Sequence, residues 1–227
     1  MKLLKIWRDE CPENPCSWDN LGTMVCWHRR YNLGDQHDFR SPEDFQEWVK
    51  EIGRKNFVIL PLYLYDHSGI TISTTPFSCP WDSGQVGWIY VTKTCLREEF
   101  GVKRITKNII RRAEEILRAE VKTYDQYLRG EVYGFTAYEV AGGNIVKIDS
   151  CGGFYGDDPE ENGILEHVPG ELREPLRKAG YLRHGLVVTE DGNELSDKRE
   201  VRRFLLERGL LPGCTLEKYD MLRELCA

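Results

Sequence analysis

The chain has 227 residues, of which 41% are hydrophobic and 30% are charged, and its formal net charge at pH 7 is −6. This composition is typical of a globular protein and excludes an intrinsically disordered chain. The negative charge also excludes the strongly basic footprint that nucleic-acid-binding chains commonly carry.

The N-terminus becomes charged too early for a signal peptide, because Lys2, Lys5 and Arg8 interrupt its apolar residues. No apolar run approaches the roughly 20 residues that a membrane-spanning helix needs. We therefore expect a cytoplasmic protein with no membrane association. In that compartment the eight cysteines are expected to be reduced thiols rather than a disulfide framework.

Two strands and a helix are expected in the first part of the chain. The strands cover Leu3–Trp7 and Met24–Tyr31. Ser41 is a capping residue, and Pro42 suits the first position of a helix. The apolar residues that follow recur at helical spacing, so the pattern predicts a helix over 42–52 with one buried face: Phe45, Trp48, Val49 and Ile52.

The middle of the chain combines strands in succession with one long helix. Its patterns predict strands at 57–65, 70–75 and 85–92, helices at 93–100 and 106–128, and a hairpin of strands at 131–140 and 144–150. Strands joined by short turns, together with one long amphipathic helix, favour an α+β fold. In this fold an antiparallel sheet is covered by the long helix.

The character of the sequence changes after the acidic segment 157–163. We expect an α+β core over residues 1–165 and a small, mainly helical C-terminal extension over 166–227. The patterns of the extension predict helices at 171–179, 197–208 and 216–226 and a strand at 185–189.

The loop entering the strand at 85–92 is the most distinctive segment of the chain. It is dense in aromatic and polar residues, which suit an interface. The candidate binding residues are Trp81, Asp82, Gln85 and Trp88.

Four residues are candidates for catalysis: Cys79, Asp82, His28 and Asp149. Cys79 could act as a nucleophile if a base lies beside it. His67 is nearby in the sequence, but the intervening strand is expected to place it about 20 Å away. A base would then have to come from His28 or His167. The alternative for Cys79 is a buried structural thiol.

A group of carboxylates surrounds the glycine-rich segment 151–156: Asp149, Asp157, Asp158, Glu160 and Glu161. Converging carboxylates could bind a hard cation. Acidic residues are also what a helix N-terminus favours, since they meet the positive end of the helix dipole there. Further candidate binding residues lie here, namely Phe154, Tyr155, Asp157 and Asp158. Because 79–87 and 151–158 adjoin strands of one expected sheet, we expect them on neighbouring parts of one surface.

Two smaller groups could hold a ligand. Cys11, Cys16, Cys26 and His28 could bind zinc, although they lack paired C-x-x-C motifs. We expect no cofactor and no tightly held metal.

Near the C-terminus, Arg199, Arg202 and Arg203 could contact nucleic acid. The segment from Val201 to Gly213 resembles the helix–RGL–helix pattern of SAP DNA-binding modules.

Three segments, 18–28, 77–90 and 149–156, resemble uncharacterised proteins of bacteriophages and integrated mobile elements. The resemblance covers about residues 18–165 and implies a genetic setting without a mechanism. In that setting we expect an accessory protein of the host cytoplasm that binds a host protein or nucleoprotein complex, in host takeover or against host defence. The alternative is a small cysteine- or metal-dependent hydrolase acting on nucleic acid, nucleotide or protein. The binding function is favoured because the sequence assembles no complete catalytic constellation.

Overall fold

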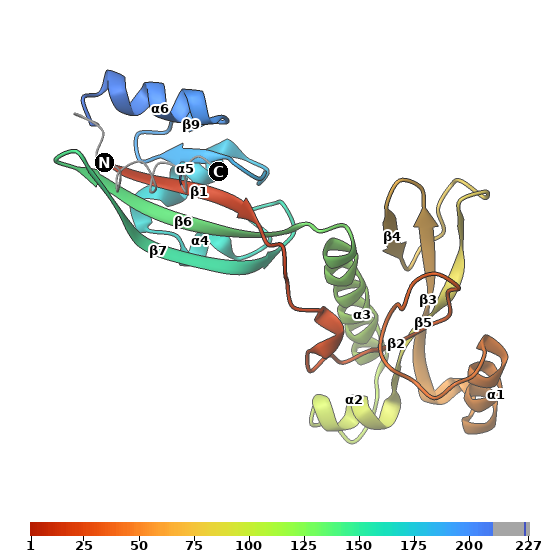
Figure 1. Ribbon diagram of the computed structural model, residues 1–227. Helices are drawn as coiled ribbons and strands as arrows, with labels where there is room; N and C mark the ends of the chain where they lie inside the picture. The colour runs from red at the N-terminus through yellow and green to blue at the C-terminus, as the bar shows by residue number, and fades with distance from the viewer. Residues whose placement is uncertain (211–224, 226–227) are drawn as a thin grey trace. The chain divides into compact units, whose positions relative to one another are not determined.

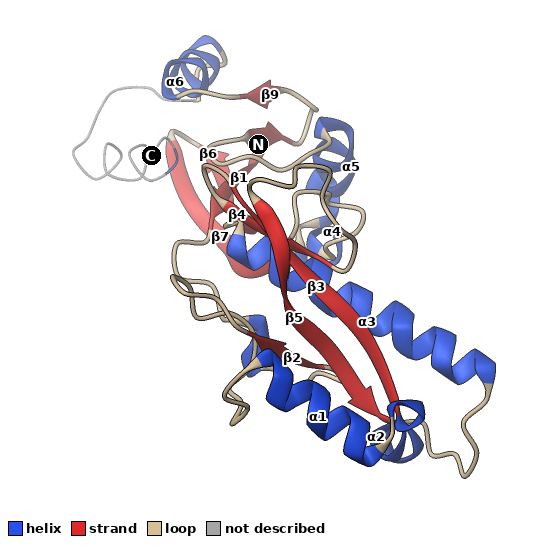
Figure 2. Ribbon diagram, turned by 90° about the vertical axis from the view of Figure 1, so that its right-hand side faces the viewer, coloured by secondary structure: helices blue, strands red, loops and turns tan. Residues whose placement is uncertain are grey.

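The computed structural model describes residues 1–210 and residue 225, which form six α-helices and two antiparallel sheets (Figures 1 and 2). The predicted α+β class is confirmed. The chain divides into two compact units. Unit 1 combines Met1–Pro12 with the chain from Gly130, and unit 2 comprises Glu13–Arg129. None of the described helices is long and apolar enough to cross a membrane.

Unit 2 is built on a four-stranded sheet with the order β2-β5-β3-β4. Its strands are β2 (Thr23–Cys26), β3 (Phe57–Asp66), β4 (Ile70–Ser73) and β5 (Ser83–Thr92). One face is covered by the long helix α3 (Lys107–Leu128), which buries Ala113, Leu117, Val121 and Tyr124. The remaining elements are η1 (Pro15–Ser17), η2 (Arg54–Asn56) and α2 (Lys93–Glu99).

The opposite face of this sheet packs against α1 (Pro42–Ile52), so the sheet lies between two helices (Figure 1). The helix begins as its sequence predicts, because the Ser41 hydroxyl accepts a hydrogen bond from the Asp44 N–H at 3.3 Å. Phe45 is buried against Trp88, with ring centroids 5.2 Å apart. Ile52 departs from the prediction, since it is exposed at the end of the helix.

Unit 1 is built on a five-stranded sheet with the order β7-β6-β1-β8-β9. Its strands are β1 (Lys2–Arg8), β6 (Val132–Ala141), β7 (Asn144–Tyr155), β8 (Val187–Thr189) and β9 (Glu194–Leu195). One face packs against the short helix α4 (Ile164–His167) and against α5 (Gly170–Ala179). Side chains of the other face pack against α6 (Lys198–Glu207).

This architecture differs from the predicted division at residue 166. Strand β8 pairs with β1, and Leu172 and Leu176 of α5 lie in one buried cluster with Leu4 and Phe135. The segment after 166 therefore completes the core of unit 1 instead of forming an extension. The strands also fall into two sheets rather than one, because β1 pairs with segments more than a hundred residues away along the chain.

Helix α6 buries Val201 and Leu205 and exposes Arg199, Arg202 and Arg203, as its periodicity predicts. Its N-cap is Asp197, whose carboxylate accepts hydrogen bonds from two backbone N–H groups of the first turn. The predicted helix at 216–226 lies outside the described residues, apart from residue 225.

Candidate functional site

The loop between β4 and β5, residues 74–82, returns the chain to the β3–β4 turn. Both β4 and β5 pair antiparallel with β3, so they run in the same direction. The loop must therefore carry the chain back before β5 begins at Ser83, which lies opposite Tyr65 near the end of β3. The Asp66 N–H donates to the carbonyl of Asp82 at 2.8 Å. Phe77 packs against Tyr65 with ring centroids 5.6 Å apart. These contacts hold the loop in one defined arrangement.

Cys79, Asp82 and His67 meet at the end of this loop. The Cys79 thiol lies 3.7 Å from Oδ2 of Asp82, and Nδ1 of His67 lies 3.4 Å from the same oxygen. The expected separation of about 20 Å between Cys79 and His67 is therefore wrong. The prediction assumed that the chain continues away from the β3–β4 turn after β4. The loop 74–82 instead brings the chain back to that turn.

This cluster does not form a nucleophile–base pair in the described arrangement. In such a pair the base contacts the nucleophile directly. Here the thiol contacts a carboxylate, and the imidazole contacts that carboxylate as well. The Ser83 hydroxyl also donates to the carbonyl of Cys79. The cluster thus cross-links the base of the loop.

Trp81 projects from the same loop and is 92% exposed, more than any other large hydrophobic side chain in the described part of the chain. A groove of about 530 Å³ lies beside it. We call this cavity the Trp81 groove; its lining includes Trp27, His28, Arg29, Arg30, Asp66, Trp81, Asp82 and Gln85. Four sequence candidates are brought together here, namely His28, Trp81, Asp82 and Gln85.

The charges of the Trp81 groove are balanced. Arg30 forms an ion pair with Asp66, and the Tyr31 hydroxyl donates to Asp66 at 3.3 Å. His28 stacks on Tyr31 with ring centroids 4.9 Å apart. The sequence reasoning missed Trp27, Arg29, Arg30 and Asp66, because only the sheet pairing brings them to this loop.

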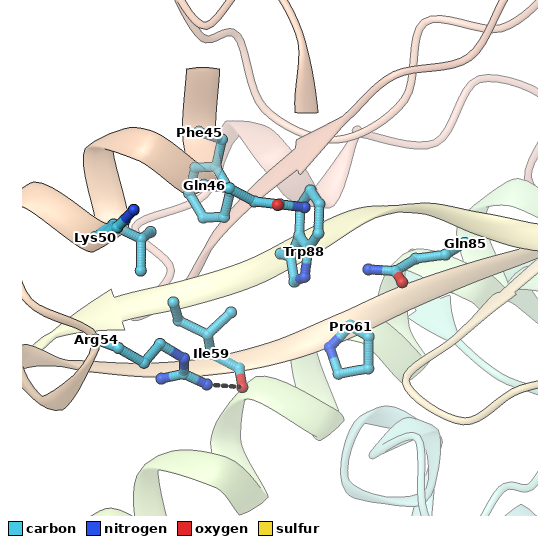
Figure 3. Close-up of a pocket in the computed structure, with 9 residues that line it drawn as sticks. Phe45, Gln46, Lys50, Arg54, Ile59, Pro61, Gln85 and Trp88 are labelled. Carbon is cyan, nitrogen blue, oxygen red and sulfur yellow. Dashed lines mark hydrogen bonds between the residues drawn. The ribbon is translucent and has the colours of Figure 1, made fainter. Parts of the chain in front are cut away.

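A second groove, of about 580 Å³, lies between α1 and the strands β3 and β5 (Figure 3). We call it the Trp88 groove; it is lined by Phe45, Gln46, Val49, Lys50, Arg54, Ile59, Pro61, Gln85 and Trp88. Gln85 lines both grooves, so the two lie next to each other on unit 2. Trp88 and Gln85 were predicted binding residues, whereas Gln46, Lys50 and Arg54 were not.

The second predicted loop belongs to unit 1 and has a mainly structural arrangement. Phe154 is only 6% exposed and packs against Phe135 and His167, so it is a core residue rather than a surface one. The Asp158 carboxylate accepts the N–H of Glu160 at 2.9 Å, which makes a turn and not the expected helix start. The helix begins later, with α4.

The remaining candidates of this loop are spread along it. Asp149 is exposed on β7 and accepts the N–H of Ser150 at 2.8 Å. Tyr155 ends β7 and is partly buried, and the carbonyl of Asp157 accepts the N–H of Leu182 at 2.6 Å. Since β7 and β5 belong to different sheets, the expectation that both loops adjoin one sheet is wrong.

The four residues proposed for zinc do not form one ligand set. Cys16 and Cys26 lie near Asp35, Cys11 is exposed in unit 1, and His28 stacks on Tyr31. Within residues 1–210 and 225, no group of three or more His, Cys, Asp or Glu side chains is placed to hold a metal ion. Burial, reinforced by the nearby Asp35 carboxylate, raises the pKa of Cys16 and of Cys26 to about 12.

These pKa values predict that Cys16 and Cys26 resist alkylation in the folded protein. Only the thiolate reacts, and with a pKa near 12 about one thiol in ten thousand is ionised at pH 8. Iodoacetamide at pH 8 should modify the exposed Cys11 and leave the partly buried Cys16 and the buried Cys26 intact. Peptide mass spectrometry measures this, with protein unfolded in guanidinium as the control. Equal modification of Cys11 and Cys26 in folded protein would contradict the burial.

Comparison of the chain with protein-family models, with curated proteins and with solved structures gives no significant match.

Proposed function

We propose that this protein acts by binding a protein partner through Trp81 and the Trp81 groove. The observation that carries the proposal is the 92% exposure of Trp81 on a loop that several contacts hold in place. Tryptophan is enriched among the residues that dominate binding energy at interfaces. A loop that is already ordered loses little conformational entropy on binding, which favours affinity.

The charges of the groove support a protein partner over nucleic acid. A nucleic-acid site needs cations that are free to meet phosphates. The groove has two arginines and two carboxylates: Arg30 is paired with Asp66, and the Asp82 carboxylate offsets the charge of Arg29. In the phage or mobile-element setting that the resemblance implies, the partner would be a host protein or a protein of a host nucleoprotein complex.

The arginines of α6 are a weaker basis for nucleic-acid contact. Arg199, Arg202 and Arg203 are exposed, but Asp197 and Glu200 lie in the same helix start. The carboxylate of Asp197 accepts the N–H of Arg199 at 2.6 Å. These acids offset part of the positive charge that phosphates would meet.

A cysteine hydrolase is the second candidate, because Cys79 and His67 share the Asp82 carboxylate. The hydrolase function is supported less well than partner binding, because the His67 imidazole contacts the Asp82 carboxylate and not the Cys79 sulfur. A hydrolase would lose turnover on Cys79→Ser, whereas partner binding through Trp81 would persist in that variant.

Trp81→Ala is expected to weaken partner binding by about 2 kcal/mol or more, a factor of about 30 in Kd. A photo-crosslinking amino acid at position 84, which lines the Trp81 groove and has open space for a side chain, captures the partner in host cells while Trp81 is retained. Titration with the purified partner then measures Kd. Tyr181→Ala is the matched control, because Tyr181 is 67% exposed but belongs to unit 1. Equal affinity of the Trp81→Ala protein and the unmodified protein would refute the proposal.

A further inference from the structure

The Trp88 groove has a positive charge that no lining carboxylate balances. Its two charged lining residues are both cations, Lys50 from α1 and Arg54 from η2. In the described part of the chain, the ammonium group of Lys50 forms no hydrogen bond or ion pair. Arg54 donates to the carbonyl of Ile59 at 3.3 Å, which keeps the guanidinium beside the groove and leaves most of its donors available (Figure 3). The groove is therefore suited to an anionic group at this end.

Trp88 supplies an aromatic wall that is fixed before any ligand binds. Its ring stacks on Phe45 at 5.2 Å and meets Trp27 edge-on at 6.0 Å, so the indole is held from two sides. Trp88 is only partly buried, and it lines the groove. A fixed indole is a surface on which a planar aromatic ligand can stack, as bases do on aromatic side chains.

Two amides lie on either side of this wall. Gln46 extends from α1 and Gln85 from β5, and Figure 3 shows Trp88 between them. The side-chain N–H of Gln85 donates to the carbonyl of Gly87 at 3.2 Å, which orients the amide. Each amide offers both a donor and acceptor lone pairs, the combination that the edge of a nucleobase requires.

We propose that the Trp88 groove binds a nucleoside 5′-monophosphate. The base lies against Trp88, the amides of Gln46 and Gln85 contact its edge, and Lys50 and Arg54 hold the phosphate. The groove volume of about 580 Å³ falls within the range of about 300–1,000 Å³ that is usual for small-molecule sites. This site is additional to the protein-binding surface proposed above.

Other occupants fit the groove less well. A purely apolar ligand would bury two cations without a counter-charge, which is unfavourable. An acidic peptide without an aromatic residue would meet the cations but has no planar group for the indole. A nucleic-acid strand would need several cations spaced along its path, whereas the groove has only two, Lys50 and Arg54.

Isothermal titration calorimetry of the full-length protein tests the proposal, with AMP, GMP, CMP and UMP as separate probes. At least one should bind, and the double substitution Lys50→Ala and Arg54→Ala should weaken its binding at least about tenfold. Lys55→Ala is the matched control, because Lys55 is exposed in the same 3-10 helix but does not line the groove. That variant should bind the nucleotide like the unmodified protein.

Two further comparisons separate this site from simpler explanations. Adenosine and inorganic phosphate, each alone, should bind more weakly than the preferred nucleotide, because each contacts only part of the groove. Trp81→Ala should leave nucleotide binding unchanged, so this test and the test of the protein-binding function can fail independently. Circular dichroism melting confirms that each variant is folded.

Four results would overturn the proposal. The first is no heat of binding with any of the four nucleotides at millimolar concentration, and the second is an affinity of the double variant equal to that of the unmodified protein. The third is inorganic phosphate that binds as tightly as the nucleotide, and the fourth is binding of a single-stranded tetranucleotide but of no mononucleotide. The third would indicate a simple anion site and the last a site for a nucleic-acid strand.

Discussion

Gly87→Ala is expected to destabilise unit 2 by about 3 kcal/mol or more. A Cβ atom at this position would lie 1.9 Å from the carbonyl oxygen of Val25 and 2.9 Å from the Cα of Cys26. Both atoms belong to the backbone of β2, so no side-chain rotation relieves the overlap. Relief requires β2 to move away from β5, which disrupts the pairing of all four β2 residues.

Urea unfolding followed by circular dichroism measures this loss, and Gly84→Ala is the matched control. Gly84 lies in the same strand, but a Cβ there has no heavy atom within 4 Å. We expect Gly84→Ala to change the free energy of unfolding by less than about 1 kcal/mol. A similar effect of both substitutions would contradict the described pairing of β2 with β5. Because β2 leads directly to Trp27 and His28, Gly87→Ala should also disturb the Trp81 groove.

The sequence predicts best those elements whose signals are local. The helix at 42–52 has the predicted bounds, because a capping serine and a proline define its start chemically. The long helix at 106–128 likewise matches α3 closely, since its apolar stripe repeats over many turns. The hairpin turn at 141–143 also lies where its glycines indicate.

Pairing between distant strands is not encoded in any local pattern. Strand β1 pairs with β6 and with β8, and neither partner can be recognised from the residues around β1. For this reason the sequence predicts one sheet where the structure has two. The predicted domain boundary near 166 is wrong for the same reason. The sequence of the short strand β8 does not indicate that it pairs with the distant strand β1.

The candidate site could be predicted in part. The density of aromatic residues indicates the loop that carries Trp81, and the structure shows that this side chain is the most exposed large hydrophobic one among the described residues. The same signal fails at Phe154, because aromatic residues serve cores as well as interfaces. Lys50 and Arg54 resemble ordinary solvent-facing charges in the sequence, and only the packing of α1 on the sheet places them at a groove.

A chain ending at residue 165 is expected to lose the folded structure of unit 1. The truncation removes α5 and β8 and thereby uncovers Leu4 and Ile6 of β1. Fully or nearly fully buried side chains are lost with it, among them Leu172, Leu176, Leu182, Leu186 and Val188. Burying a side chain of this kind contributes about 1.5–3 kcal/mol. Their combined loss is comparable to the whole stability of a typical domain, about 5–15 kcal/mol.

Hydrogen exchange with mass spectrometry distinguishes this outcome from a dispensable extension. Amides of β1 and β6 should exchange rapidly in the truncated chain, whereas amides of β3 and β5 in unit 2 should stay protected and serve as the internal control. Unchanged protection of β1 and β6 would mean that the core of unit 1 does not need the segment after 165.

A point substitution tests the same contact without removing the segment. Leu172 is fully buried in α5, so Leu172→Ala should cost about 2–5 kcal/mol of unfolding free energy. Lys178→Ala in the same helix is the matched control, because Lys178 is exposed and its replacement should change stability by less than about 0.5 kcal/mol. If α5 belongs to the core of unit 1, Leu172→Ala also speeds the exchange of β1 amides. If α5 were a separate module, the faster exchange would be confined to α5 itself.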